Sequence, residues 1–226
     1  MRSRREELAR AIGDDAVLFS CEGVVEQVIV DKLVTKHLTF INRNRIITDP
    51  YNDDAWSTCD RSGESLARDF LTQDYGRNVT ILCIQDQLGH RTLLRQPYAK
   101  HARTINVTTH PEIEMLIVCR EGKLDEYNSW KSHHRGTKNS KLKPSLFCKE
   151  ELGRDDRNFR DVKKYPFLNQ YWDDADALVR ALELYRELAS AKKQGLTLCW
   201  PICSASDQRS SASCQGWSKK SKIRSK

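Results

Sequence analysis

The fold is decided by a short apolar run that ends in an acid and a glycine, Ala16-Val17-Leu18-Phe19-Ser20-Cys21-Glu22-Gly23. The six residues before Glu22 are mostly apolar, which is typical of a strand buried on both faces. From Val24 to Leu33 the apolar residues recur at helical spacing instead. A buried strand that turns directly into an amphipathic helix is the opening unit of an α/β fold.

The same alternation continues along the chain. Residue patterns predict further strands at residues 39–47, 79–84 and 104–108, and further helices at residues 63–72, 110–117, 144–152 and 173–193. Ser62 is the expected N-cap of the helix at 63–72, and Asp173 or Asp174 that of the last helix. Alternating strands and helices predict a three-layer α/β fold around a mainly parallel sheet.

Composition divides the chain into five segments. We expect a basic N-terminal arm at 1–10, an α/β domain at 11–125, a basic mobile loop at 126–143, a helical C-terminal extension packed on the domain at 144–194, and a disordered basic tail at 195–226. The net charge of +7 belongs to the two ends, because the arm carries +2 and the tail +5. Residues 11–194, between these ends, have a net charge of zero. The basic balance therefore says little about what the fold binds.

Nothing in the chain indicates a membrane or secreted protein. No apolar run approaches the roughly 20 residues that a membrane span needs. The first residues, which are rich in arginine, lead into no apolar stretch of signal-peptide type. We therefore expect a cytoplasmic protein without membrane contact. Cys21, Cys83 and Cys119 lie inside apolar patterns, and we expect them to be buried, reduced thiols.

Three carboxylates stand where predicted strands end. Glu22 follows the first strand directly, Glu26 lies one helical turn further on, and Asp86 follows the strand at 79–84. If these two strands are neighbours, all three side chains open into the crevice at their carboxyl ends, where such sheets bind ligands. Carboxylates packed together raise each other's pKa unless a cation neutralises them, and Mg²⁺ (or Mn²⁺) takes oxygen ligands.

A purely structural explanation of the same acids stays open. Glu22 and Glu26 could be first-turn acids that the helix dipole favours. Asp86 could accept hydrogen bonds from its own turn.

The residues Cys21-Glu22-Gly23-Val24-Val25-Glu26 resemble the first motif of Toprim domains, in the form found in OLD-family and RloB-type proteins. The resemblance covers residues 16 to about 120, including the order of elements. It implies a Toprim/Rossmann-like fold and a metal-dependent nuclease, with Glu22 as the acid/base and metal-linked glutamate and Glu26 assisting. It also implies a role in defence against phage or other mobile DNA.

The second motif of that family, Asp-x-Asp after the third strand, is incomplete. Asp86-Gln87-Leu88 keeps only the first acid, and a leucine cannot bind metal. Either Glu112 or Glu114 completes the site, or the site is degenerate. A helix would let only one of these two glutamates face the crevice. The predicted metal ligands are therefore Glu22, Asp86 and Glu112.

The segment at 128–143 is the candidate for holding a phosphate backbone. It contains no acidic residue, and its cations are Lys131, Arg135, Lys138, Lys141 and Lys143. Trp130, His133 and His134 accompany them. The alternative is an ordinary solvated loop.

Two functions follow from these patterns. The first is a Mg²⁺-dependent nuclease in which Glu22 and Glu26 are catalytic. The second is a non-catalytic module with a degenerate metal site, which binds nucleic acid, a partner protein or a second copy of the chain. The chain has no Gly-x-Gly-x-x-Gly, no Walker loop and no Gly-x-Ser-x-Gly, which argues against dinucleotide binding, ATP hydrolysis and serine hydrolysis.

Overall fold

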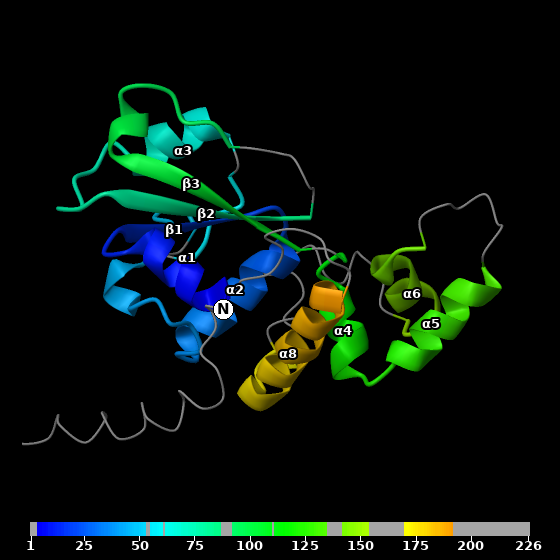
Figure 1. The fold of residues 1–226 in the computed structure, drawn as a ribbon. Coiled ribbons are helices and arrows are strands. Elements are labelled where there is room, and N and C mark those ends of the chain that lie inside the picture. Colours follow the sequence, from blue (N-terminus) through cyan, green and yellow to red (C-terminus); the bar gives the residue numbers. More distant parts are fainter. Residues whose placement is uncertain are drawn as a thin grey trace, which may run out of the picture.

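The computed structural model describes residues 4–52, 55–60, 62–86, 92–109, 111–134, 142–153 and 170–191 (Figure 1). Its elements in chain order are α1 (Arg4–Ile12), β1 (Ala16–Cys21), α2 (Val24–Thr35), η1 (Arg43–Arg45), α3 (Gly63–Phe70), β2 (Val79–Gln85), η2 (Tyr98–Lys100), β3 (Ala102–Thr108), α4 (Met115–Arg120), α5 (Leu124–His133), α6 (Pro144–Glu150) and α8 (Ala175–Ala191).

The sheet consists of three parallel strands in the order β1-β2-β3. Ala16 lies opposite Val79, and Val79 lies opposite Ala102, so the three strands start at the same level. Every residue of β1 and β2 is buried, which explains why apolar residues dominate both strands. The predicted α/β class is confirmed, and so is the expected neighbourhood of β1 and β2.

Helices cover both faces of this sheet, because successive side chains of a strand point to opposite sides. Val17 and Phe19 of β1 belong to a large apolar cluster that includes α1, α2, α4 and α8. Leu18 belongs to a second, smaller cluster with Leu66 and Phe70 of α3. Figure 1 accordingly shows α3 on one side of the sheet and α1 and α2 on the other.

The last helix packs against α4 and shares the large apolar cluster. Leu178, Leu182 and Tyr185 of α8 are almost fully buried there. The Ala177 N–H donates to Asp174 Oδ1 at 3.0 Å, which confirms one of the two predicted N-caps. None of the helices in the described ranges is long and apolar enough to cross a membrane.

The strand predicted at residues 39–47 was wrong. This segment contains the short helix η1 and touches β1 only at an isolated bridge between Ile46 and Val17. The Asn42 side chain accepts from the Asn44 N–H at 3.0 Å, and this local contact closes a turn instead of a strand.

The predicted N-terminal arm is in fact a helix from Arg4 onward. Leu8 and Ile12 of α1 are buried in the large cluster, at 7% and 2% exposure. Their spacing of four places them on one face of the helix. The surrounding charges concealed this apolar pair in the sequence.

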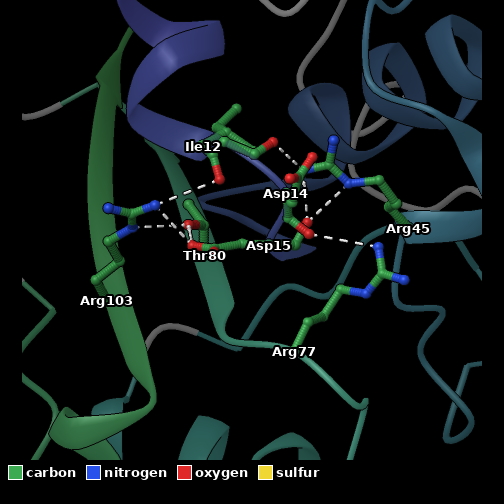
Figure 2. Close-up of polar contacts among 8 residues, drawn as sticks. Ile12, Asp14, Asp15, Arg45, Arg77, Thr80 and Arg103 are labelled. Atoms are coloured by element: carbon green, nitrogen blue, oxygen red, sulfur yellow. Dashed lines mark hydrogen bonds and ion pairs between the residues drawn. The ribbon is translucent and has the colours of Figure 1, made fainter.

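Arginines fix the turn between α1 and β1 (Figure 2). Arg103 Nη2 on β3 donates to Asp15 Oδ2 at 2.7 Å, and the buried Thr80 hydroxyl of β2 donates to the same oxygen at 2.6 Å. Arg45 Nη2 donates to the backbone carbonyl of Asp15, also at 2.6 Å. This arginine clasp, formed by Asp15, Thr80, Arg45 and Arg103, ties α1 to the amino ends of all three strands.

The loop predicted at residues 126–143 is helical in its first part, where α5 runs to His133. Tyr127 and Trp130 are buried, and both rings pack edge-on against Phe147 of α6. Two aromatic residues are too few to show helical periodicity, so the polar residues between them dominated the sequence pattern. The tail predicted at 195–226 lies outside the described residues.

Candidate carboxylate site

Two acids meet at the carboxyl ends of β1 and β2. Glu22 follows β1, and its N–H donates to the Ile84 carbonyl at 2.8 Å, so the β1–β2 ladder extends to this residue. Asp86 follows β2, and its N–H donates to Glu22 Oε2 at 2.6 Å. The parallel pairing of the strands thus places both predicted site residues at one edge of the sheet, as expected.

Glu26 lies beside this pair in the first turn of α2. Its side chain folds back over Gly23, because a Cβ atom on Gly23 would come within 3.1 Å of Glu26 Oε2. Gly23 has φ −147° and ψ 177°, an extended conformation that any residue adopts. The glycine therefore provides space for the Glu26 carboxylate, and it is not needed for the backbone turn.

The opposite wall comes from the segment before α4 and from the start of α6. Glu112 forms an ion pair with Lys143 and accepts from the Ser145 hydroxyl at 2.7 Å. Glu114 also faces the pocket, although the sequence pattern allowed only one of the two glutamates to do so. The reason is that α4 begins only at Met115, so residues 112–114 do not follow helical spacing.

Together these groups enclose a pocket of about 340 Å³. Its lining residues are Glu22, Gly23, Val24, Val25, Glu26, Asp86, Glu112, Ile113, Glu114, Lys143 and Ser145. Five carboxylates therefore face one cation within the described part of the chain. The pocket has a strong excess of negative charge when its acids are ionised.

Burial and mutual repulsion change the protonation of Glu26 and Asp86. The pKa of Glu26 is raised from 4.5 to about 7, mainly by burial and to a lesser extent by the charges of Glu114, Glu22 and Asp86. Burial also raises the pKa of Asp86 from 3.8 to about 6, with the adjacent Glu22 as the next cause. Lys143 opposes this rise. At neutral pH the pocket thus holds one carboxyl close to half-protonation.

Glu22 and Asp86 are the pocket residues to consider as ligands of a cation. Asp86 Oδ1 is buried and has no hydrogen-bond partner among the described residues. No three His, Cys, Asp or Glu side chains in the described ranges form a group that could hold a metal ion. Mg²⁺ is commonly held by one or two carboxylates, with waters and substrate phosphates in its other positions. Glu22 and Asp86 suit this kind of site, whereas both Glu112 oxygens already accept from Lys143 and Ser145.

The predicted nucleic-acid-binding residues divide into three groups. Lys143 lines the carboxylate pocket. Lys131 lies on α5 over the Tyr127 ring, 5.1 Å from its centroid, and is not part of the pocket lining. Trp130, which was expected to accompany the cations, is buried in the core. The remaining predicted cations, Arg135, Lys138 and Lys141, lie outside the described residues.

Two residues of the site carry no sequence signal that would have identified them. Ser145 holds Glu112 in place, and its position after Pro144 marks only a helix start. The Tyr185 hydroxyl of α8 donates a hydrogen bond to the Pro111 carbonyl, and this bond fixes the segment that carries Glu112. Tyr185 was correctly expected on the inward face of the last helix, but this contact could not be foreseen from periodicity.

A larger cavity of about 780 Å³ lies at the other end of the sheet, beside the amino ends of β2 and β3. Asp15 lines it, but that carboxylate is already engaged in the arginine clasp. Parallel sheets bind ligands at the carboxyl ends of their strands. The smaller, acidic pocket is therefore the candidate functional site.

Comparison with known proteins does not place the chain in a family. Family models, curated proteins and solved structures all give no match to this chain.

Proposed function

We propose that this chain is a Mg²⁺- or Mn²⁺-dependent phosphodiesterase that cleaves nucleic acid at the carboxylate pocket. The observation that carries the proposal is the Glu22–Asp86 pair, which leaves a buried Asp86 oxygen without a hydrogen-bond partner in the described structure. A buried acceptor of this kind is costly, and a bound cation would satisfy it.

In this proposal each acid has a separate task. Glu22 and Asp86 would hold the cation, which supplies charge stabilisation at a phosphoryl oxygen and a more acidic bound water. Glu26 would take up and return a proton, because a pKa of about 7 suits a group that gains and loses protons at neutral pH. The apolar surroundings that raise this pKa also exclude bulk water from the carboxyl.

Lys143 would provide the positive charge that meets a substrate phosphate. It is half-exposed, it lines the pocket, and its partner Glu112 is also held by Ser145. Lys143 could therefore turn to a phosphate while Glu112 keeps one hydrogen bond. We assign the other predicted backbone-binding residues, among them Lys131, to the same substrate path.

The finer features of the fold and setting belong to the same proposal. We infer a Toprim-like three-layer architecture with a C-terminal helical extension, and a cytoplasmic role against phage or mobile DNA. The resemblance at Cys21–Glu26 supports these steps, together with the placement of Glu22 and Asp86 on adjacent parallel strands.

Two observations favour a second candidate, a non-catalytic module that binds a partner protein or nucleic acid. The Lys143–Glu112 pair already neutralises part of the pocket, and the second family aspartate is replaced by Leu88. A module of this kind would need no cation.

Metal titration separates the two candidates. Mg²⁺ and Mn²⁺ are added to the wild type and to the Glu22→Ala and Asp86→Ala variants, and the melting temperature and the protons released are measured. Glu64→Ala, an exposed acid of α3 outside the pocket lining, is the matched control. Binding should raise the melting temperature of the wild type and the control only. It should also release protons at pH 6.5, because a cation lowers the raised pKa values of Glu26 and Asp86.

Cleavage of plasmid and of single-stranded substrates is then measured with the same four proteins. Metal-dependent cleavage that both pocket variants lose supports the nuclease. Metal binding without cleavage, or no response to millimolar metal, favours the binding module.

A further inference from the structure

The segment at residues 55–60 runs alongside the end of β1. Ser20 and Thr58 are partners in an isolated parallel bridge. The Cys21 N–H donates to the Thr58 carbonyl at 2.7 Å, and the Thr58 N–H donates to the Phe19 carbonyl at 2.9 Å. These two hydrogen bonds fix the register of the segment against β1.

This register places two cysteines next to each other. Cys21 and Cys59 are one step beyond the Ser20–Thr58 pair, and adjacent strands lie about 4.8 Å apart. Disulfides join residues whose Cα atoms are roughly 4.4–6.8 Å apart. In a parallel pair, side chains at the same level point to the same face of the sheet.

Side-chain contacts confirm that both thiols face α2. Cys59 Sγ donates to Gln27 Oε1 of α2 at 3.4 Å. Cys21 lies in the apolar cluster that contains α2, and its thiol contacts the Ser57 side chain. Ser57 in turn donates to Asp31 Oδ1 of α2 at 3.2 Å, and the spacing of two puts it on the same face as Cys59.

Exposure distinguishes Cys59 from the other described cysteines. It is solvent-exposed, whereas Cys21, Cys83, Cys119 and Cys148 are buried, and none of these five is in a disulfide in the described part of the chain. A small oxidant therefore reaches Cys59 first, and the nearest buried thiol across the bridge is Cys21.

We propose that Cys21 and Cys59 form a redox modification site that closes to a reversible disulfide in the presence of a peroxide. The Cys59 thiolate attacks one peroxide oxygen, which gives a sulfenic acid and releases one water after protonation. The Cys21 sulfur then attacks the sulfenic sulfur, the S–S bond forms, and a second water leaves. Two thiols and one hydrogen peroxide thus become one disulfide and two waters, and a dithiol reverses the change.

The disulfide would act on the neighbourhood of the carboxylate pocket without requiring the proposed nuclease activity. It would fasten residues 55–60 to the end of β1, immediately before Glu22. It would also remove the thiol donor from Gln27, which follows Glu26 on α2. The modification site is independent of whether the pocket binds a cation.

Peptide mapping of the full chain tests the proposal. The protein is treated with hydrogen peroxide, its remaining thiols are alkylated, and it is digested with trypsin without reduction. Cleavage after basic residues places Cys21 in the peptide 11–32 and Cys59 in the peptide 46–61. We expect these two peptides to be joined in the larger part of the oxidised wild type, and to separate after dithiothreitol.

Two variants test whether the disulfide joins Cys21 to Cys59. Cys59→Ser, at an exposed position that should not disturb folding, must abolish the joined peptide and leave Cys21 alkylatable only after unfolding. Cys148→Ala, a buried cysteine elsewhere in the core, must leave the joined peptide unchanged. The proposal is overturned if Cys59 stays reduced, goes on to sulfinic acid without joining Cys21, or joins another cysteine instead.

Discussion

The N–H of Asp86 donates to Glu22 Oε2 at 2.6 Å, so a backbone donor after β2 is satisfied by a carboxylate that follows β1. The contact ties the ends of two adjacent strands together. It also brings the Asp86 carboxyl next to a like charge, which contributes to raising the pKa of Asp86 to about 6. The hydrogen bond therefore stabilises the fold at this point, whereas the repulsion between the two carboxylates destabilises it.

Asp86→Asn should separate these two effects. The variant keeps the backbone hydrogen bond and removes one repelling carboxylate, so the free energy of unfolding at pH 7.5 without metal should rise by about 1 kcal/mol, after discounting for solvent screening. The same variant should lose the stabilisation by Mg²⁺. Thermal unfolding with and without metal measures both, and a drop in metal-free stability would contradict the prediction.

Glu26→Gln should change how stability depends on pH. The folded-state pKa of Glu26, about 7, lies above its ordinary value of 4.5, so the folded protein binds the proton more tightly than the unfolded chain. The stabilisation linked to this proton is complete below pH 4.5 and is lost as the pH rises through about 7.

The glutamine variant, which cannot ionise, should therefore gain stability relative to the wild type across this pH window. The gain should level off at roughly 3 kcal/mol above pH 7.5. Urea unfolding at pH 4.5, 6 and 7.5 gives the comparison, with Glu64→Gln as an exposed control. Parallel pH profiles for wild type and Glu26→Gln would rule out a raised pKa at this residue.

Lys143→Met should affect a cation and a phosphate in opposite directions. Lys143 is the described cation of the pocket lining, and it lowers the pKa of Asp86. Without it the pocket is more negative, so Mg²⁺ affinity should increase several-fold, while substrate affinity should fall several-fold. Calorimetric titration of Mg²⁺ checks the expected increase in cation affinity, and measurement of KM checks the expected decrease in substrate affinity. Lys149→Met, an exposed residue of α6, should change neither.

Asp15→Ala should destabilise the fold without involving the candidate site. The substitution removes the acceptor for both Arg103 and the fully buried Thr80 hydroxyl (Figure 2). The free energy of unfolding should fall by about 2 kcal/mol. The neighbouring exposed Asp14→Ala should change it by less than about 0.5 kcal/mol. Metal binding at the opposite end of the sheet should be retained in both variants.

The sequence predicted those parts of the fold whose residues carry their own pattern. The buried strands β1 and β2 are mostly apolar, and the N-cap at Asp174 depends on residues close to it in sequence. The sequence placed Glu22 and Asp86 at strand ends, and their meeting was expected on the condition that the two strands are neighbours, which the parallel pairing of β1 with β2 fulfils.

The errors arose where individual side-chain contacts, local or long-range, outweigh the periodic pattern. Residues 43–45 turn because of an asparagine contact, and α1 is a helix because two apolar side chains reach the core. The wall formed by Glu112 and Ser145 depends on residues more than thirty positions apart. Local periodicity carries no information about such pairs.

The hydroxyl of Tyr185, which holds the Pro111 carbonyl, has a consequence for biosynthesis. A nascent chain that ends at residue 134 already contains β1, β2, Glu22 and Asp86. It still lacks Lys143, Ser145 and the helix that anchors the segment before α4. During translation the acids are therefore synthesised before their counter-charge, and the pocket can reach its final form only after the last helix has been made.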